Sequence, residues 1–239
     1  MEPSDVVAEI APTGQLRASI NLGNAVLAQG TKEQPSGVTV DLARELACRL
    51  EVPVEFLCFD AARKSFEAMV DGRADICFLA VEPAREAQVA FTAPYVVIEG
   101  VYVVPADSPI RSVADVDRAG VRVGVKHGSA YDLYLTRTLE SAEVVRGDEG
   151  VAVFDDLNLE VGAGIRQPVS AYASSRTDRR VLDEAFMQIR QAMGTTPDRS
   201  DKTVAWLSAF VEECRAGGFV AESLRSAGLD EELVAPVPG

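Results

Sequence analysis

The sequence predicts an α/β protein made of two similar units. Short apolar runs typical of strands alternate with segments in which apolar residues recur at helical spacing. This alternation occurs twice along the chain, and no low-complexity segment or long linker separates the two series. Two further apolar stretches, residues 95–104 and 185–193, suggest that the chain crosses from one unit to the other and back.

The first unit is expected to fold as β-α-β-α-β. Its predicted strands and helices are, in order, residues 16–20, 40–50, 52–58, 61–70 and 74–79. Leu42, Leu46 and Leu50 recur every four residues of the first helix, which is typical of a buried helical face. Asp41 lies near the start of that helix, where a carboxylate interacts favourably with the helix dipole.

The second unit repeats the architecture without repeating the sequence. Its predicted strands and helices are, in order, residues 121–126, 129–139, 144–145, 149–156 and 159–163. Two helices, residues 198–216 and 219–227, follow the second crossing, and Gly217-Gly218 is expected to end the first of them. We expect both helices to belong to the first unit.

Composition excludes several classes of partner. The 239 residues include 23 basic and 37 acidic side chains, a net charge of −14, which disfavours nucleic acid and anionic membranes. No apolar run approaches the roughly 18–20 residues of a membrane span, so no membrane insertion is expected. The start, Met1-Glu-Pro-Ser-Asp5, is not a secretory signal. A periplasmic or extracellular location is therefore expected if a signal peptide was removed, and a cytoplasmic one if Met1 is the native start.

The residues that commonly hold metals or cofactors are sparse. His127 is the only histidine, and no C-x-x-C pair occurs. The phosphate-binding G-x-x-x-x-G-K-[ST], the dinucleotide-binding G-x-G-x-x-G and the nucleophile elbow G-x-S-x-G are also absent. We therefore expect no metal, no cofactor and no catalytic residue. Buried free thiols are expected for the four cysteines, although the sequence leaves a disulfide open: Cys48, Cys58, Cys77 and Cys214.

Residues 85–95 are the most informative stretch. They read Arg-Glu-Ala-Gln-Val-Ala-Phe-Thr-Ala-Pro-Tyr, with Arg85 just past a predicted strand and a second strand expected to end at Pro94-Tyr95. An arginine held there offers a two-pronged donor to a carboxylate. The run resembles the amino-acid-binding family of type II solute-binding proteins of ABC importers, solute-binding protein family 3. Its members carry Arg-x-x-x-Val-x-Phe-Ser/Thr-x-Pro-Tyr.

Three further segments carry the same resemblance: Gly37-Val-Thr-Val-Asp41-Leu, Gly72-Arg-Ala-Asp75-Ile and Val123-Gly-Val-Lys126-His-Gly128-Ser129. The resemblance implies a two-lobed, periplasmic-binding-protein-like type II fold, each lobe a small sheet flanked by helices. The expected division is residues 1–96 and 190–239 in lobe 1 and 97–189 in lobe 2. A two-segment hinge is expected near 95–100 and 186–192.

The resemblance also implies a function. We expect a monomeric receptor, not an enzyme, that closes its lobes around a small carboxylate ligand: an amino acid, a modified amino acid or an organic acid. An ABC permease would be its partner. Two alternatives stay open, a cytoplasmic ligand sensor and an enzyme that resembles cyclohexadienyl dehydratase on the same fold. The enzyme would need a general acid, and Glu82, Glu99 and Glu160 are the carboxylates near the expected cleft.

Arg85 is the expected carboxylate ligand in lobe 1. In lobe 2, a strand turns into a helix at Lys126, Gly128, Ser129 and Ala130, where unpaired backbone N–H groups could bind an anion. Ser129 could equally serve as the helix cap, and both roles are compatible.

Three other residues are weaker candidates. Asn21 and Asn24 follow the first strand, where relatives place ligand-contacting side chains, although asparagine also favours turns. Arg166 lies in the matching loop of lobe 2 and is a candidate second cation. The lone His127 is interpreted as a solvent-facing turn residue.

Four positions depart from the family pattern. Phe78 and Ala80 replace a Gly-x-Thr, and Ala62 stands where an aromatic residue is common. Phe78 could fill the space left at Ala62, and both Phe78 and Ala80 are expected to line the site. Ile165 stands where an acidic residue usually receives the ligand's ammonium group. Burying an ammonium without a partner is costly, so an organic acid or a modified amino acid is the expected ligand.

Overall fold

The computed structural model describes residues 3–236 and divides into two compact units. Unit 1 contains the chain up to Val97 and from Arg190 onward, and unit 2 contains Ile98–Ile189. The chain passes between the units within two long strands, β6 (Ala90–Pro105) and β11 (Met187–Thr195).

The strands of unit 1 follow the order β4-β1-β5-β11 within a nine-stranded sheet. Strand β1 is parallel to both of its neighbours, and β11 is antiparallel to β5. The elements of this unit are α1 (Pro3–Ile10), β1 (Leu16–Asn21), β2 (Gln29–Gly30), β3 (Pro35–Ser36), α2 (Val38–Arg49), β4 (Val54–Phe59), α3 (Ala62–Val70), β5 (Ile76–Ala80), α4 (Pro83–Glu86), α8 (Asp201–Ala216), α9 (Phe219–Ser226) and a 3-10 turn (Glu231–Leu233).

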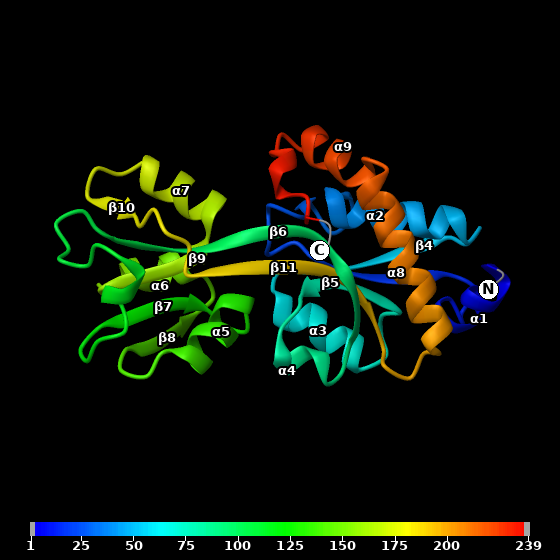
Figure 1. Cartoon of the computed structure of the whole chain (residues 1–239), viewed down its shortest axis with the longest axis horizontal. Coiled ribbons are helices and arrows are strands. Elements are labelled where there is room, and N and C mark those ends of the chain that lie inside the picture. Colours follow the sequence, from blue (N-terminus) through cyan, green and yellow to red (C-terminus); the bar gives the residue numbers. More distant parts are fainter. Residues whose placement is uncertain (1–2, 237–239) are drawn as a thin grey trace. The chain divides into compact units, whose positions relative to one another are not determined.

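Helices cover both faces of this sheet. Figure 1 shows α3 and α4 on one side of the strands and α2, α8 and α9 on the other. On the α3 side, Met69 packs in a buried cluster with Cys77, Leu79 and Val89. The odd-numbered residues of β5 therefore face α3, because successive side chains of a strand point to opposite faces.

Unit 2 has the strand order β6-β9-β7-β8, and β10 pairs with β6. Strand β7 is parallel to β8 and β9, whereas β6 is antiparallel to β9. The elements are a 3-10 turn (Val113–Asp115), β7 (Arg122–Lys126), α5 (Ala130–Thr138), β8 (Glu143–Gly147), α6 (Gly150–Asp156), β9 (Val161–Ile165), α7 (Arg166–Ser174) and β10 (Arg179–Val181). Phe154 of α6 and Val169 of α7 share one core cluster with Val101 and Val103 of β6.

Strand β6 differs from the expectation for residues 85–95. The strand does not end at Pro94-Tyr95 but continues for 16 residues, from Ala90 to Pro105. Proline fixes φ near −65° and pushes the preceding residue toward extended geometry, so it is compatible with a continuing strand. The expected end at Pro94-Tyr95 was therefore wrong.

One arginine–carboxylate pair recurs in both units. In unit 1, the Arg17 backbone N–H and Nε each donate to Asp75 Oδ2 over 2.9 Å, and Nη2 donates to Oδ1 over 2.7 Å. In unit 2, the Arg122 backbone N–H and Nε donate to Glu160 Oε2 and Nη2 donates to Oε1, each over 2.9 Å. Each pair links the first residues of a unit's central strand to the acidic residue that precedes its third strand.

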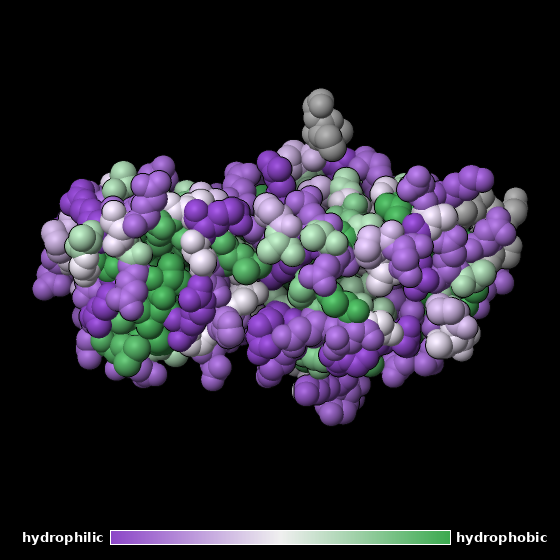
Figure 2. Space-filling view, turned by 90° about the horizontal axis from the view of Figure 1, so that it is seen from below, coloured by the Kyte–Doolittle hydropathy of each residue, from purple (hydrophilic) through white to green (hydrophobic). Residues whose placement is uncertain are grey.

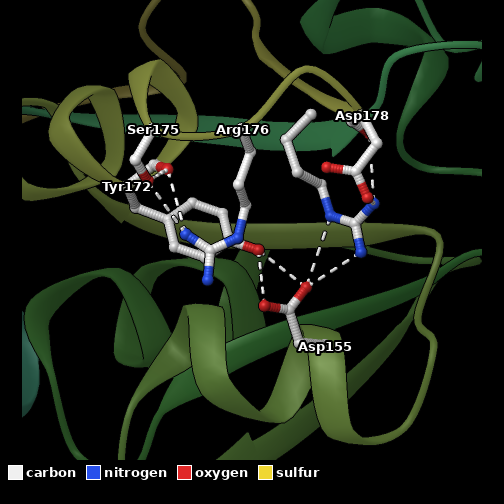
Figure 3. A network of polar contacts seen from close by, with 6 residues as sticks. Asp155, Tyr172, Ser175, Arg176 and Asp178 are labelled. Carbon is white, nitrogen blue, oxygen red and sulfur yellow. Dashed lines mark hydrogen bonds and ion pairs between the residues drawn. The ribbon is translucent and has the colours of Figure 1, made fainter.

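A polar network fixes α7 against α6 and β10 (Figure 3). The Tyr172 hydroxyl donates to Asp155 over 2.6 Å, and Arg179 Nη2 donates to the same carboxylate over 3.0 Å. The Arg176 guanidinium lies 4.0 Å from the centre of the Tyr172 ring. These contacts hold the helix whose first residue is Arg166.

All four cysteines are free thiols. Cys77 and Cys214 are buried, Cys58 is half-buried, and Cys48 is exposed. The expectation that all four are buried was therefore wrong for Cys48 and only partly met by Cys58. The residue lies on the outer face of α2, which it shares with Asp41, Arg44 and Glu45, whereas Leu42 and Leu46 face the core.

The surface of the molecule is mostly hydrophilic. Figure 2 shows this on the face that it views, together with a hydrophobic area over unit 2. Among the described residues, Val70 and Leu157 are the large hydrophobic side chains with high exposure. Between residues 3 and 236, no helix has both the length and the apolar character needed to cross a membrane.

Candidate functional site

The order of strands in unit 1 defines where its functional residues gather. Strand β1 lies between β4 and β5, and the chain visits β4 first and β5 afterwards. The direction of winding therefore reverses between the carboxyl ends of β1 and β5, the position at which open α/β sheets usually bind ligands. The parallel pairing of Ala18 with Ile76 and of Ser19 with Cys77 puts the carboxyl ends of both strands at the same edge of the sheet.

Asn21 does not follow the first strand, contrary to the expectation, but is the last residue of β1, whereas Asn24 lies in the loop after it. Both side chains shape this loop. The Gly23 N–H donates to Asn21 Oδ1 over 3.0 Å, and the Val26 N–H donates to Asn24 Oδ1 over 3.3 Å. A Cβ at Gly23 would lie 2.0 Å from the carbonyl oxygen of Asp60, so the loop packs tightly against the end of β4. Turn formation is thus established for both asparagines, and their contact with a ligand stays a prediction.

Arg85 follows the other strand of the pair. It lies in the short helix α4, directly after β5, and its Nη1 donates to the carbonyl oxygen of Ala80 over 3.1 Å. The side chain is buried, with 3% of the residue exposed. Burial lowers the pKa of Arg85 to about 10, opposed by the charge of Glu82. The guanidinium therefore stays cationic at neutral pH and is held in one place at the carboxyl end of β5.

Phe78 and Ala80 are buried residues of β5. They lie on the face opposite Cys77 and Leu79, because side chains alternate along a strand. The Phe78 ring packs edge-on against Tyr95, with ring centres 6.0 Å apart. The structure therefore brings Phe78, Ala80 and Arg85 together on consecutive elements of unit 1.

Unit 2 has a reversal of the same kind. Strand β7 lies between β8 and β9, and the chain visits β8 first. Strands β7 and β9 run parallel, with Gly124 paired to Gly162. The turn after β7 and the start of α7 therefore lie at the same edge of this sheet.

The turn after β7 is closed by a carboxylate of its own helix. The Gly128 N–H donates to Asp132 Oδ2 over 2.8 Å, and the Asp132 N–H donates to Ser129 Oγ over 3.0 Å. Ser129 is thus the N-cap of α5. The expectation of unpaired N–H groups was wrong for Gly128 and also for Ser129, whose N–H donates to the carbonyl oxygen of Lys126 over 3.1 Å. Ala130 is the first helical residue, and its N–H has no intrahelical partner by helix geometry.

The two cationic candidates of unit 2 are paired inside the unit. Lys126 forms an ion pair with Glu149. Arg166 pairs with Glu99 and donates through Nη2 to the carbonyl oxygen of Asp183 over 2.9 Å. Arg166 was expected in a loop, but it is the first residue of helix α7. His127 is exposed in the turn.

The carboxylates considered for an enzyme have different surroundings. Glu160 is held by Arg122, and its pKa is lowered mainly by the hydrogen bonds from that side chain. Glu99 is paired with Arg166. Glu82 is buried at the end of β5, next to the residues of the unit 1 site. In the part of the chain that the structure describes, no cluster of His, Cys, Asp or Glu could hold a metal ion.

Comparison with known proteins identifies the family. The model of the bacterial extracellular solute-binding proteins, family 3, matches residues 26–226. The chain belongs to this family. The family resemblance noted in residues 85–95 and the three further segments is therefore confirmed, and the chain is a member of a family of binding proteins.

Solved structures confirm the type II fold of this family 3 protein. A mutant of the arginine-binding protein ArgBP from T. maritima superposes with a TM-score of 0.76 at 18% identity, covering 93% of this chain and 99% of that one. A binding component of an ABC transporter from Wolinella succinogenes, complexed with lysine, gives 0.74 at 19% identity, with 89% and 95% covered. The ancestral amino-acid-binding protein AncCDT-1, described as a precursor of cyclohexadienyl dehydratase, gives 0.73 at 21%, with 92% and 98% covered.

Two features of this family 3 protein escaped sequence analysis. The role of Asp132 had a visible signal, because Ser129-x-x-Asp132 is the pattern of a helix capping box. Helix α7 was not predicted, because Pro168 suggested a loop. Proline is tolerated in the first turn of a helix, where its missing N–H would have no partner in any case.

Proposed function

We propose that this protein is a receptor that binds a small carboxylate of the amino-acid class, with Arg85 as the donor to the ligand's carboxylate. The observation that carries the proposal is the placement of Arg85. It is a buried cation fixed to the carbonyl oxygen of Ala80, at the point of unit 1 where the winding reverses. A buried guanidinium is costly to desolvate, and a carboxylate ligand that is also removed from water would interact with it strongly.

The ligand class has support from two directions. The family consists of extracellular solute-binding proteins, and solved structures with the same fold are described as bound to arginine or complexed with lysine. The net charge of −14 repels an anion at long range, which favours a ligand that also carries positive charge.

Unit 2 would complete the site in the proposed cycle. Bending near residues 95–100 and 186–192 would let unit 2 close on a ligand already held by Arg85, with lobe boundaries at residues 1–96, 97–189 and 190–239. The Ala130 N–H and the Arg166 side chain are the donors proposed for this step. Ligand contacts made only in the closed form would select that form. An ABC permease in the membrane is the proposed partner, and the proposed location is outside the cytoplasm.

Calorimetric titration with a panel of L-amino acids and small organic acids tests the central step. The wild-type protein should bind at least one member of the panel. Arg85→Met should weaken that binding at least about 30-fold, because loss of a buried charge partner costs roughly 2–5 kcal/mol. Arg225→Met is the matched control, since Arg225 is an exposed arginine of α9 in the same unit. Equal affinity of both variants would contradict the role of Arg85.

Thermal unfolding provides an independent reading of the same panel. Ligand at about 100 times its dissociation constant stabilises the folded state by roughly 2.7 kcal/mol. For a chain of this length that corresponds to a rise in Tm of roughly 5–10 °C. If no ligand shifts Tm and none gives a calorimetric signal, the proposed binding function is contradicted although the chain belongs to the family.

Binding without turnover is also part of the proposal. A receptor returns its ligand unchanged, whereas a dehydratase would consume it. Proton NMR of a ligand incubated with purified protein should show the starting compound alone. Appearance of a product that is lost in Glu82→Gln would instead support an enzyme that uses Glu82 as its general acid.

A further inference from the structure

We infer that Glu82 is a second ligand-binding residue of unit 1, and that its carboxylate accepts hydrogen bonds from a cationic nitrogen of the ligand. The inference rests on the proposed function, because it concerns the site of Arg85. It revises the expectation drawn from Ile165, since it provides the acceptor that Ile165 cannot.

The face of β5 on which Glu82 lies supports this role. Cys77 and Leu79 point into the core cluster under α3. The Val81 N–H donates to the carbonyl oxygen of Arg190 over 2.9 Å, so the pairing with β11 continues beyond Ala80. Glu82 itself has φ −140° and ψ 138° and is still extended. Alternation along this extended backbone places Glu82 on the same face as Phe78 and Ala80.

Glu82 and Arg85 form a compact unit of opposite charges. The Arg85 N–H donates to the backbone carbonyl oxygen of Glu82 over 2.8 Å, as expected for the first turn of α4. Only 3% of each residue is exposed. The charge of Glu82 also favours the cationic form of Arg85. Their side chains therefore influence each other in a setting where water screens little.

This pair of charges matches one class of ligand. Arg85 and Glu82 together contribute no net charge, so a simple anion would gain from the arginine and be repelled by the glutamate. A ligand with both a carboxylate and a cationic nitrogen gains from both residues. The nitrogen is either the α-ammonium group or a cationic group on the side chain, and the same acceptor chemistry serves both.

A purely internal role for Glu82 makes a different prediction. If Glu82 only neutralises Arg85, its removal changes the binding of every carboxylate ligand by the same factor. If Glu82 contacts the ligand, its removal weakens only ligands that carry the cationic nitrogen. Glu82→Gln keeps the shape of the side chain and removes the charge, so it separates the two roles.

The experiment compares matched ligands by calorimetric titration of the whole chain. L-Arginine, L-lysine and L-glutamine are each titrated beside their 2-hydroxy acid analogues, which lack the α-ammonium group, and norleucine replaces lysine to remove the side-chain ammonium. Glu82→Gln should weaken the binding of the amino acid at least about 30-fold, because its hydrogen bond to a charged carboxylate is lost. The affinity for the analogue that lacks the relevant nitrogen should change less than about threefold. Glu86→Gln, on the exposed side of the same helix, should change neither.

Each outcome has a defined meaning. The inference is supported if Glu82→Gln selectively weakens the binding of ligands that carry the α-ammonium group or of ligands that carry the side-chain cation. The ligand that is affected identifies which nitrogen donates to Glu82. An equal change for ligands with and without the nitrogen, at unchanged Tm, would overturn it and leave Arg85 as the sole charged contact. If the wild-type protein binds none of these ligands, both the proposed function and this inference are overturned.

Discussion

The two arginine–carboxylate pairs provide a matched test of how burial determines the strength of an ion pair. The geometry is the same in both units, but the exposure differs. Asp75 is fully buried, with 0% of its side chain exposed, whereas Glu160 and Arg122 are 38% and 39% exposed. Arg17→Met removes the Nε and Nη2 donors and retains the backbone N–H and most of the aliphatic stem. Arg122→Met does the same in unit 2.

The expected costs differ several-fold. Removing one partner of a buried pair destabilises by about 3–5 kcal/mol, because the remaining carboxylate is left without compensation. Removing one partner of an exposed pair costs about 1 kcal/mol or less. Arg17→Met should therefore lower Tm by roughly 10 °C and Arg122→Met by less than about 4 °C. Thermal unfolding followed by circular dichroism measures both Tm shifts. Equal destabilisation would refute the argument from burial.

Three further predictions concern other sites. Without denaturant, a thiol reagent should label Cys48 at once, and Cys77 should react only after unfolding, because it is buried and its pKa is raised to about 12 by burial; rapid labelling of Cys77 would contradict the packing of β5. The pKa of Glu160 is lowered by Arg122, so its contribution to stability is present above its unfolded pKa and is lost as pH falls through the folded value. The stability difference between wild type and Glu160→Gln should therefore shrink as pH falls from about 6 to about 3, and a constant difference would contradict it. Ser129→Ala should cost about 1 kcal/mol in urea unfolding by removing the N-cap of α5, and no loss would show that Asp132 alone caps the helix.

The regular elements could be predicted because their apolar spacing is local information. The spacing of Leu42 and Leu46 predicted a helix at residues 40–50, and α2 spans Val38–Arg49. The Gly217-Gly218 pair marked the end of α8, which closes at Ala216 with Gly218 in the left-handed region. Helices α4 and α7 were missed because each has a proline in its first turn, at Pro83 and Pro168, where proline can begin a helix as well as prevent one.

The candidate site was predictable only in part. The position of Arg85 follows from the motif, but its burial and its bond to Ala80 depend on how β5 and α4 pack. Glu82 was considered only as an acid for an enzyme. Its place on the face of Phe78 becomes visible only when the extended backbone is seen to continue past the end of β5.

The partners of the unit 2 cations were also hidden from sequence analysis. Arg166 pairs with Glu99, which lies 67 positions earlier in the chain, and Lys126 pairs with Glu149, the residue that precedes α6. Such pairings are set by which strands become neighbours. A single sequence gives no measure of that. Arg166 was predicted as an available second cation and Lys126 as part of an anion-binding turn, and both side chains were found paired.

The most direct measurement of the central claim is a calorimetric titration of wild type and Arg85→Met with the same L-amino acid, under the same salt and pH. The account predicts saturable binding of one ligand per chain by wild type and a loss of affinity of at least about 30-fold in Arg85→Met, with the folded state retained. Undiminished binding by a folded Arg85→Met variant would contradict the claim that Arg85 at the end of β5 holds the ligand.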